Sequence, residues 1–564
     1  MSGGINPNST IGDVLDRQVE RFPGRDALVN VETGERYTYA EFREAVERVA
    51  RGLMALGIQR GHHVGIWATN YSEWVLTQFA TAKIGAVMVN VNPAYRTHEL
   101  AYVLDQSEAN AIILIGRFRN SDYAAMLNEV VPELKDSNSG ELRSSRFPYL
   151  RNVVYIPPHD DGADGETPAG MWAWDEMVAK HSDVSPEQLA ARQAECRPDD
   201  PINIQYTSGT TGNPKGAMLT HHNLVSNGLY VGDCIELTEN DRLCVPVPFY
   251  HCFGCVMGNL GCITHGSAII IASEHFDPLK TLQALERERC TALYGVPTMF
   301  IAQLGHTDFD SFDLTPLRTG IMAGSPCPIE VMRQVIDRMG ADQMTIAYGQ
   351  TEHSPVITQT LVSDSIERRV STVGAVLPGV EARIVDPETG QILGPGTQGE
   401  LQARSSMVMR GYYNMPEATA AAIDDEGWLH TGDLAEVDEG GYYKITGRLK
   451  DMIIRGGENV YPREIEEFLY THPKISDVQV VGVPDERFGE EVMAWVMLKP
   501  GESAEAEEIR EFCRGKIAHF KVPRYVKVTE EFPMTVTGKI QKFRMREMAV
   551  EELGLQAASQ IETA

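Results

Sequence analysis

The sequence is short of positive charge. Among its 564 residues, 79 Asp and Glu face only 50 Lys and Arg, which gives a formal net charge of −29 at pH 7. This excess of acid disfavours non-specific binding to nucleic acids or membranes, and it favours solubility. An anionic ligand would therefore have to be met by locally clustered cations and backbone N–H groups, so the basic residues near any motif are informative.

Long hydrophobic runs are also missing. The runs present, such as AIIIA at 268–272, fall far short of the roughly 18 residues that a membrane-spanning helix needs. The N-terminal segment has no apolar stretch behind basic residues, so no signal peptide is expected. We therefore expect a cytoplasmic enzyme, and a chain of this length is expected to form several domains or subdomains.

Cysteines are few, and their spacing shows no pattern of disulfide pairs. Nine are scattered along the chain, and this odd number argues against a set of disulfides. Cys252 and Cys255 form a CxxC pair that follows His251, with Cys262 nearby. A structural zinc site usually has a second ligand pair at a defined spacing, and the sequence offers none. Buried free thiols are therefore favoured over metal binding or redox chemistry.

The first part of the chain alternates between helical and strand patterns. Helices are expected at 40–56 and 73–85, and strands at 62–68 and 86–92. Such alternation indicates α/β layers with parallel strands. It resumes at about 202–300, and a further helix is expected at 328–340. The polar, turn-rich stretch 134–169 is expected to be a surface excursion.

The pattern changes beyond about residue 370. Short β-like runs such as ARIVD and GELQA, separated by Gly and Pro turns, predict a small β subdomain. A last unit begins near residue 447, with a strand at 451–455 and a helix that Pro462 opens. The expected fold class is α/β: a large N-terminal domain of layered α/β subdomains plus a small β subdomain, followed by a small α+β C-terminal domain.

The segment YTSGTTGNPKG, residues 206–216, has a composition suited to phosphate oxygens. Gly209 precedes Lys215 by six positions, as a Walker A loop requires, but Pro214 and Gly216 replace its second glycine and its metal-binding hydroxyl. Proline has no N–H to offer a phosphate, and glycine has no side chain to hold a metal. We expect the loop to bind nucleotide phosphates in another way, with an ordinary Gly/Ser/Thr turn as the alternative.

Further motifs follow this loop in a fixed order. They are YGQTE (348–352), WLHTGD (428–433), GRLKDMIIRGGENVYPREIE (447–466) and PMTVTGKIQK (533–542). In order and spacing the set resembles the adenylate-forming superfamily, which comprises acyl-CoA synthetases, peptide-synthetase adenylation domains and firefly-type luciferases. The resemblance covers nearly the whole chain. It implies that a carboxylate attacks the α-phosphate of ATP, giving an acyl-adenylate and pyrophosphate, and that a thiol, normally coenzyme A, then displaces AMP.

The resemblance also implies which residues bind the nucleotide. The loop would hold the β- and γ-phosphates, the segment 323–326 would stack on adenine, and Asp433 and Arg448 would contact the ribose. Thr351 would contact the α-phosphate, and Glu352 would bind Mg²⁺, a hard cation commonly held by carboxylates and phosphates. A solvated glutamate and a surface Asp–Arg ion pair are the alternatives. The expected nucleotide-binding set is Thr207, Ser208, Gly209, Thr210, Thr211, Gly212, Lys215, Gly324, Ser325, Tyr348, Gly349, Gln350, Asp433 and Arg448.

Two lysines carry the implied mechanism. Lys539 would be catalytic in the first half-reaction, together with Thr351 and Glu352, because a flexible ammonium can reach the carboxylate and the α-phosphate together. Lys450 would be the hinge between an AMP-binding domain, 1–449, and a mobile lid domain, 450–564. The remaining expectations concern coenzyme A: Gly456 and Gly457 beside its pantetheine arm, and Arg455, Lys521 and Arg524 near its phosphates.

The segment VPVPFYHCFGC (245–255) resembles the loop that lines the acyl pocket. His251 would face the acid, and small residues such as Gly254, Cys255 and Gly258 would open room for an alkyl chain. Together with LYGVPTMFIAQL (293–304) and YGQTEHSP (348–355), this segment is most similar to the medium-chain fatty acyl-CoA ligase branch. The alternative for His251 is a histidine packed in the core.

Other functions stay open. An aryl-acid CoA ligase, an enzyme that loads another thiol acceptor and a luciferase-like oxygenase would share these motifs. A peptide-synthetase module would normally continue into a carrier domain, whereas this chain stops 25 residues after Lys539. A non-enzymatic ATP-binding regulator is disfavoured because Lys539, Glu352 and Asp433 are all present. No nucleic-acid partner and no membrane span are expected, and the sequence does not predict an oligomeric state.

Overall fold

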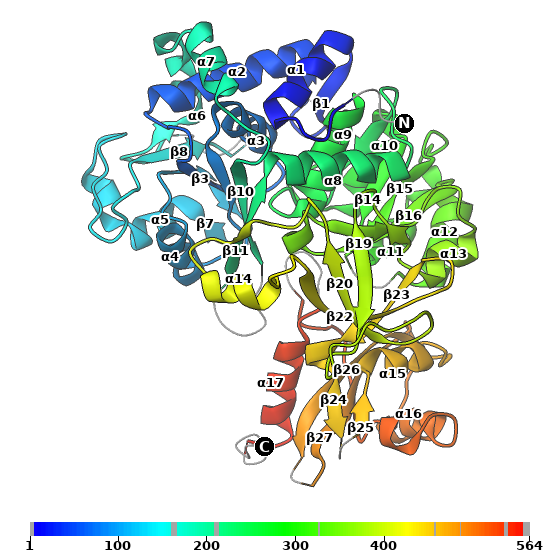
Figure 1. Ribbon diagram of the computed structural model, residues 1–564. Coiled ribbons are helices and arrows are strands. Elements are labelled where there is room, and N and C mark those ends of the chain that lie inside the picture. Colours follow the sequence, from blue (N-terminus) through cyan, green and yellow to red (C-terminus); the bar gives the residue numbers. More distant parts are fainter. Residues whose placement is uncertain are drawn as a thin grey trace. The chain divides into compact units, whose positions relative to one another are not determined.

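The computed structural model describes residues 5–158, 166–207, 214–324, 327–455, 458–485, 487–534 and 540–556 (Figure 1). Internal contacts divide the chain into two compact units. Unit 1 comprises Met1–Glu381 and Arg404–Leu429, and unit 2 comprises Ala382–Ala403 and His430–Ala564. The small β subdomain is thus grouped with the C-terminal module. The predicted boundary at Lys450 is the point about which the terminal domain is expected to move. The division by internal contacts does not test that movement, so the boundary stays a prediction.

Unit 1 is built on two large sheets. The first runs β18 (Ala375–Val376), β17 (Val356–Gln359), β16 (Gln343–Gly349), β15 (Thr319–Ala323), β14 (Ala292–Gly295), β12 (Arg242–Cys244), β13 (Ala268–Ile271), β1 (Asp26–Asn30) and β2 (Arg36–Thr38). The second runs β21 (Gly411–Tyr412), β11 (Lys215–Thr220), β10 (Pro201–Thr207), β4 (Val87–Asn90), β3 (His63–Trp67), β5 (Ala111–Ile115), β8 (Asn152–Ile156) and β9 (Trp172–Ala173). A separate short hairpin pairs β6 (Arg117–Phe118) with β7 (Ser121–Asp122).

The central strands of both sheets are parallel, and antiparallel strands lie toward the edges. Parallel strands covered on both faces are apolar throughout rather than alternating. The strand Ala111–Ile115, with the sequence AIILI, is buried at every position. The predicted layered α/β architecture with parallel strands is therefore confirmed.

Fourteen α-helices belong to the described part of unit 1. They are α1 (Ile11–Arg21), α2 (Tyr39–Ala55), α3 (Ser72–Ile84), α4 (Thr97–Gln106), α5 (Tyr123–Val130), α6 (Trp174–Ala179), α7 (Pro186–Ala194), α8 (His221–Cys234), α9 (Gly261–His265), α10 (Pro278–Arg287), α11 (Pro297–Leu304), α12 (Ile329–Met339), α13 (Ile366–Ser371) and α14 (Pro416–Ala422). A π-helix spans Phe253–Leu260.

Two of these helices lie in the interior of unit 1. Every residue of α3 except Glu73 is buried, and most residues of α8 are buried as well. A helix that is covered all round belongs to a core rather than to a surface. The helix α8 begins where the Thr220 hydroxyl accepts the Asn223 N–H, and it packs against the π-helix and α9. Its polar side chains therefore need partners inside the protein.

The expected helices and strands of the first part are confirmed, with ends that differ by one or two residues. The polar stretch 134–169 is a partial exception, because it contains β8, whose sequence NVVYI is fully buried and pairs in parallel with β5. The expectation of a surface excursion was wrong for this segment. The strand has only five residues and is flanked by turn residues, so the composition of the whole stretch does not reveal it.

Unit 2 contains two smaller sheets. The first runs β19 (Glu381–Val385), β20 (Gly399–Arg404), β22 (Leu429–Val437) and β23 (Tyr443–Arg448). The second runs β25 (Glu458–Val460), β24 (Ile453–Arg455), β27 (Gly489–Leu498) and β26 (Ile475–Asp485), with β28 (Tyr525–Val528) also paired to β27. Three helices accompany them: α15 (Pro462–Leu469), α16 (Ala506–Cys513) and α17 (Lys542–Glu552). The predicted β subdomain and α+β module are confirmed.

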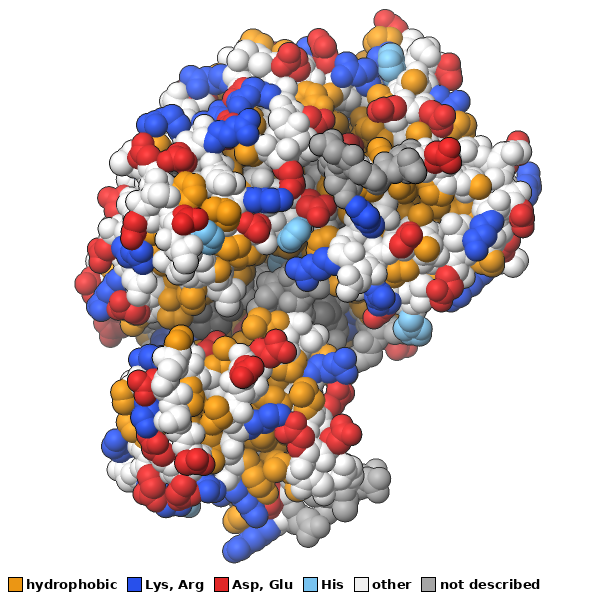
Figure 2. Space-filling view, turned by 180° about the vertical axis from the view of Figure 1, so that it is seen from behind, with side chains coloured by type: hydrophobic (Ala, Val, Ile, Leu, Met, Phe, Trp, Pro, Cys, Tyr) orange, Lys and Arg blue, Asp and Glu red, His pale blue; other side chains and the backbone are white. Residues whose placement is uncertain are grey.

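The surface mixes charges of both signs. Acidic and basic side chains are interspersed over the face that Figure 2 shows. Among the described residues, no helix is long and apolar enough to cross a membrane.

Candidate functional site

The two ends of the predicted phosphate loop are held by a hairpin. Thr207 ends β10, Lys215 begins β11, and the two residues pair in register. The Tyr102 hydroxyl of α4 donates to the Pro214 carbonyl oxygen at 3.0 Å. Five predicted loop residues lie outside the described residues: Ser208, Gly209, Thr210, Thr211 and Gly212. Their role at the phosphates stays a prediction, while the anchors at both ends of the loop are defined.

The helix α4 also supports the start of the loop. The Tyr206 hydroxyl donates to the Gln106 side-chain oxygen, and the Gln106 amide donates to the Tyr413 carbonyl oxygen at 2.6 Å. Burial raises the pKa of Tyr206, so this hydroxyl stays a donor. One glutamine thus ties the strand before the loop to the segment around residue 413.

Two further predicted segments lie at the carboxyl ends of neighbouring parallel strands. Gly324 follows β15, and Tyr348 and Gly349 end β16, which pairs in parallel with β15. Gly324 has a φ of 88°, in the left-handed region that glycine adopts readily. At Gly349 any Cβ would overlap the Pro355 carbonyl oxygen, so a larger residue is excluded. Crevices at such strand ends are where open α/β sheets bind ligands. Ser325 lies outside the described residues.

Glu352 is not a freely solvated glutamate. It is half-buried, and its Oε1 accepts a hydrogen bond of 2.7 Å from the Tyr412 hydroxyl. The Glu352 carbonyl oxygen accepts the Met409 N–H at 2.8 Å. Burial, with the Glu352 charge second, raises the pKa of Tyr412 and keeps its hydroxyl protonated. Among the described residues, Oε2 accepts no hydrogen bond and stays available for a ligand.

The carboxylate of Glu352 fits Mg²⁺. This cation prefers oxygen ligands and is usually bound by one or two carboxylates together with substrate phosphates and water. In the described part of the chain, no group of three or more His, Cys, Asp or Glu side chains is placed to hold a metal. A cation at Glu352 would therefore take its other ligands from water and the nucleotide.

The loop that carries Glu352 is held by neutral hydrogen bonds. His353 is fully buried; its Nδ1 pairs with the Val356 carbonyl oxygen and its Nε2 with the Ser405 hydroxyl, each at 2.9 Å. Burial lowers the pKa of His353 to about 4, so the ring is uncharged at neutral pH. Asn227 of α8 bonds to both the N–H and the carbonyl oxygen of Val356. These contacts fix the backbone on the C-terminal side of Glu352.

The predicted acyl-pocket residues have mixed outcomes. His251 is exposed, and its Nδ1 accepts the Phe253 N–H at 3.1 Å, so it is not a packed core histidine. Cys252 and Cys255 are buried free thiols on either side of Gln205: Cys252 donates to the amide oxygen at 2.9 Å, and the amide nitrogen donates to Cys255 at 3.3 Å. Burial raises the pKa of Cys255 to about 12, which keeps it protonated. That His251 faces the acid stays a prediction.

Gly254 and Gly258 lie where the chain packs closely against residues 245–248. A Cβ on Gly254 would overlap the Pro248 carbonyl oxygen, and one on Gly258 would lie 2.8 Å from a Val245 methyl carbon. Both positions are buried against the backbone or side chains of residues 245–248. These contacts explain the glycines without an acyl chain, so an open pocket beside them stays a prediction that the packing does not support.

The structure brings motifs together that are distant in sequence. Burial raises the pKa of Cys252, and a hydrogen bond from the Thr351 side chain opposes that rise. Gln205, which contacts Cys252, lies on β10 two residues before Thr207. The start of the phosphate loop, the segment at 252–255 and the YGQTE loop are therefore neighbours within unit 1.

In unit 2, Asp433 and Arg448 pair across β22 and β23. They are opposite in register, and Arg448 Nε lies 2.9 Å from Asp433 Oδ1. Asp433 is 7% exposed, whereas the Arg448 side chain is 35% exposed. The ion pair expected as the alternative therefore exists, but its carboxylate is largely buried rather than on an open surface. Contact with a ribose stays a prediction.

Lys450 lies on a short 3₁₀ turn, Leu449–Asp451, directly after β23. Its side chain reaches solvent, yet partial desolvation, with the Arg448 charge second, lowers its pKa. Its role as a hinge stays a prediction. Lys539, Gly456 and Gly457 lie outside the described residues, so their predicted roles stay predictions as well.

The three cations expected near coenzyme A phosphates already have partners. Arg455 forms a two-point ion pair with Glu491, with Nε 2.7 Å from Oε2 and Nη2 2.9 Å from Oε1. Lys521 pairs with Glu464, and Arg524 pairs with Asp485 at 2.8 Å. Contact of these three cations with coenzyme A phosphates stays a prediction.

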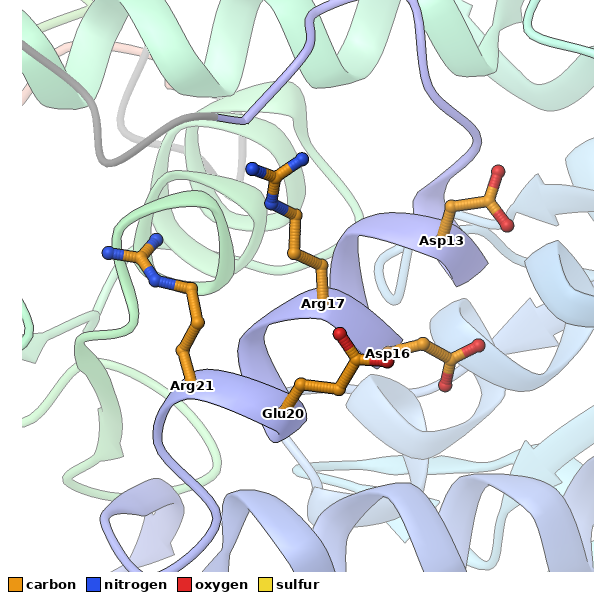
Figure 3. A pocket seen from close by; sticks show the side chains of 5 residues that line it. All are labelled: Asp13, Asp16, Arg17, Glu20 and Arg21. Atoms are coloured by element: carbon orange, nitrogen blue, oxygen red, sulfur yellow. The ribbon is translucent and has the colours of Figure 1, made fainter.

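A surface hollow along α1 is not a second candidate. Its lining, shown in Figure 3, consists of Asp13, Asp16, Arg17, Glu20 and Arg21. Asp16 is paired at 2.7 Å with buried Lys83, so part of its charge serves the fold. The hollow carries both signs of charge and contains none of the motif residues.

Comparison with known proteins agrees with this geometry. The chain matches the AMP-binding enzyme family over residues 15–413 and the AMP-binding enzyme C-terminal domain over residues 464–539. The chain belongs to the AMP-binding enzyme family.

Relatives within this family are similar over most of their lengths. The chain is 53% identical to YngI of Bacillus subtilis, whose name assigns it to the acyl-CoA synthetases, covering 98% of this chain and 99% of that protein. It is 47% identical to the medium-chain acyl-CoA ligase ACSF2, mitochondrial, of Danio rerio, over 97% of this chain and 89% of the relative. The protein therefore falls among the acyl-CoA synthetases of the AMP-binding enzyme family.

Solved structures support the same fold. The anthranilate CoA ligase AuaEII, in complex with anthranoyl-AMP, matches with a TM-score of 0.84 at 26% identity and covers 98% of this chain and 100% of that one. The predicted fold class, a large α/β N-terminal part with a smaller C-terminal part, is that of this AMP-binding enzyme family.

Several supporting residues of this AMP-binding enzyme were missed from the sequence. They are Tyr102, Gln106, Asn227, His353 and Tyr412. His353 directly follows YGQTE, so a search of the flanks would have included it. The other four lie on helices or strands remote from any motif, and only the fold brings them to the site.

Proposed function

We propose that this protein is an ATP-dependent acid–CoA ligase that activates a medium-chain fatty acid as its acyl-adenylate and then transfers the acyl group to coenzyme A. One observation carries the proposal: the Tyr412 side chain contacts both Glu352 and Lys215. A carboxylate whose Oε2 accepts no hydrogen bond from the described residues therefore lies near the end of the phosphate loop. That arrangement suits a nucleotide whose phosphates need both a cation and a lysine.

The first half-reaction joins two anions, so its catalyst must offset charge. A carboxylate oxygen of the acid forms a bond to the α-phosphorus of ATP, and the bond from that phosphorus to the pyrophosphate oxygen breaks. We assign Lys215 to the departing phosphates and Lys539 to the carboxylate and the α-phosphate. Mg²⁺, when bound at Glu352, would neutralise phosphate charge. Catalysis of this kind depends mainly on positioning and electrostatics.

The second half-reaction forms the thioester. The sulfur of coenzyme A attacks the acyl carbonyl carbon, the bond to the adenylate oxygen breaks, and AMP leaves with its electron pair. We assign Asp433 and Arg448 to the ribose in both halves, Lys450 to the hinge of the lid domain, and Gly456 and Gly457 to the passage for the pantetheine arm. These assignments follow from the motifs in which the residues lie.

The acid is proposed from similarity. A medium-chain acyl-CoA ligase is 47% identical to this chain, whereas the anthranilate ligase is 26% identical. An aryl acid is therefore the second choice. The cytoplasmic location rests on the sequence alone, since the ACSF2 relative is named as mitochondrial.

The direct test is a panel of acids from acetate to palmitate, with benzoate, supplied with Mg·ATP. Pyrophosphate release without coenzyme A reports the first half, and AMP and acyl-CoA formation with coenzyme A report both. A maximum at medium chain length is expected. A maximum at benzoate would favour the aryl-acid alternative, and release of no pyrophosphate with any acid would overturn the proposal.

Lys539→Ala tests the catalytic assignment. We expect adenylation to fall by about a hundredfold or more, because a charge that stabilises the transition state is lost. Thioester formation from supplied acyl-adenylate should stay within about twofold, because the lysine is assigned to the first half only. The control is Lys444→Ala, an exposed lysine of unit 2 whose partner Glu436 lies 3.8 Å away. Equal loss in both halves would contradict the assignment.

A further inference from the structure

We propose that Tyr412 is a positioning residue: it orients Glu352 toward the cation of Mg·ATP and keeps Lys215 from pairing with that carboxylate. The inference rests on the proposed function. Tyr412 belongs to none of the motifs from which the site was predicted, and it lies 60 residues after Glu352 in the sequence.

The first contact fixes one oxygen of the carboxylate. The Tyr412 hydroxyl donates to Glu352 Oε1 at 2.7 Å, the length of a strong, charge-assisted hydrogen bond. The Glu352 backbone is held as well, since its carbonyl oxygen accepts the Met409 N–H. With the backbone and Oε1 both held, the direction of Oε2 is set. Hydrogen bonds of this kind orient metal-binding carboxylates in proteins.

Tyr412 itself cannot move easily. Its side chain is buried, at 7% exposure. Its N–H donates to the Thr419 hydroxyl at 2.9 Å, and it pairs in register with Ala217 on β11. The tyrosine is thus part of the same sheet as the strand that leaves the phosphate loop.

The second contact concerns the lysine. Lys215 Nζ lies 5.0 Å from the centroid of the Tyr412 ring, within the range of a cation–π interaction. Lys215 and Glu352 carry opposite charges, yet among the described residues no ion pair joins them. A neutral tyrosine between them gives each a partner without cancelling its charge. Both charges therefore stay available to the nucleotide, the lysine for phosphate and the carboxylate for the cation.

The next residue supplies a natural control. The Tyr413 hydroxyl donates to Glu108 at 2.6 Å, and its ring packs edge-on against His63. Tyr412 and Tyr413 therefore make the same kind of hydrogen bond to a glutamate, but of the two side chains only that of Tyr412 contacts predicted site residues, Glu352 and Lys215. A purely structural role would make their phenylalanine variants alike.

The experiment measures equilibrium binding without an acid, so that no reaction occurs. Calorimetry gives the Kd of ATP in saturating Mg²⁺ and in EDTA for the wild type, Tyr412→Phe and Tyr413→Phe. Tyr412→Phe keeps the ring and removes the hydroxyl, so it should raise the Kd of Mg·ATP about tenfold. It should change the Kd of metal-free ATP by less than about twofold. Tyr413→Phe should leave both values within about twofold of wild type.

Repeating the substitution of Tyr412 in a Glu352 variant tests its contact with Glu352 separately from its contact with Lys215. In Glu352→Gln the carboxylate is already absent, so adding Tyr412→Phe should produce no further loss of Mg·ATP binding. Tyr412→Leu removes the ring as well, and it should weaken metal-free ATP binding by about threefold through Lys215. Should Tyr412→Phe fail to fold by circular dichroism, Tyr412→Trp, which keeps an N–H donor, takes its place, with near-wild-type Mg·ATP binding expected.

The outcomes separate the two proposals. If the wild type binds no Mg·ATP, the proposed function fails before any variant is compared. If the wild type binds it and Tyr412→Phe matches the wild type, the positioning role is overturned while the function stands. Equal weakening with and without Mg²⁺, or equal effects of Tyr412→Phe and Tyr413→Phe, would also overturn the role.

Discussion

Unit 1 and unit 2 hold their candidate site residues by different kinds of contact. In unit 1, the loop that carries Glu352 is fixed by buried, uncharged groups, with His353 and Asn227 bonded to the Val356 backbone. In unit 2, Asp433 and Arg455 are each held by an ion pair, to Arg448 and Glu491 respectively. Neutral buried contacts keep one geometry, whereas each of these ion pairs joins a buried carboxylate to a more exposed cation, with Arg448 35% and Arg455 17% exposed.

This difference predicts which substitutions and pH changes each unit can tolerate without unfolding. Buried polar groups are costly to leave without a partner, so the network around His353 is expected to fail as a whole. Partly exposed ion pairs contribute less, because water and salt screen them. Unit 1 should therefore respond strongly to the protonation of its histidines, and unit 2 should tolerate loss of single charges at its exposed pairs, such as Arg463–Glu467.

The largest expected effect is acid destabilisation of unit 1. Burial lowers the pKa of His353 and of His221 to about 4 each, below the ordinary value near 6.5. Between these values the unfolded chain takes up a proton that the folded chain refuses. The contribution of each neutral histidine to the free energy of unfolding is therefore complete above pH 6.5. It is lost as the pH drops to about 4, and the loss is about 3 kcal/mol for each histidine.

Denaturant unfolding at pH 7 and pH 4.5, followed by tryptophan fluorescence, checks this prediction. Five of the six tryptophans belong to unit 1, so the signal reports mainly that unit. His353→Gln should lose stability at pH 7 and show a smaller drop on acidification than wild type. His519→Gln, an exposed change in unit 2, is the control. An unchanged drop in His353→Gln would mean that this ring is not the titrating group.

A smaller effect is expected from Asp433→Asn in unit 2. An amide accepts hydrogen bonds more weakly than a carboxylate, so the KM for ATP should rise about tenfold. The fold should survive, because Arg448 is 35% exposed and can be solvated. Steady-state kinetics and a thermal melt measure the two effects, with Glu436→Gln on the same strand as control. A large loss of stability at unchanged KM would assign Asp433 to the fold alone.

The smallest effect is expected at Arg463 of α15. Its Nε lies 3.1 Å from Glu467 Oε1, and the Glu467 side chain is 47% exposed. Such an i,i+4 pair contributes about 0.5 kcal/mol or less. In a urea titration, the free energy of unfolding of Arg463→Ala should therefore lie within about 0.5 kcal/mol of the wild-type value. A cost above about 1 kcal/mol would show that partly exposed pairs in unit 2 matter more than the comparison implies.

Much of the fold could be predicted because local pattern determines local structure. The helix at 39–55 follows from apolar periodicity, and the strand at 63–67 and the helix at 72–84 follow from short and long apolar segments. The strand Asn152–Ile156 was missed because five apolar or amide residues among turns carry no periodic signal. Its membership of the sheet depends on pairing with β5, which is distant in sequence.

The sequence by itself determined the motifs, their order and the family to which they point, because these depend on residue identity and spacing along the chain. Only the tertiary structure decided that Tyr412 contacts Glu352 and Lys215, that Asn227 holds Val356, and that Gly254 is needed for packing. The physical reason is that hydrogen bonds and close packing act over a few ångströms in space. Sequence separation does not encode which distant side chains the fold brings within that reach.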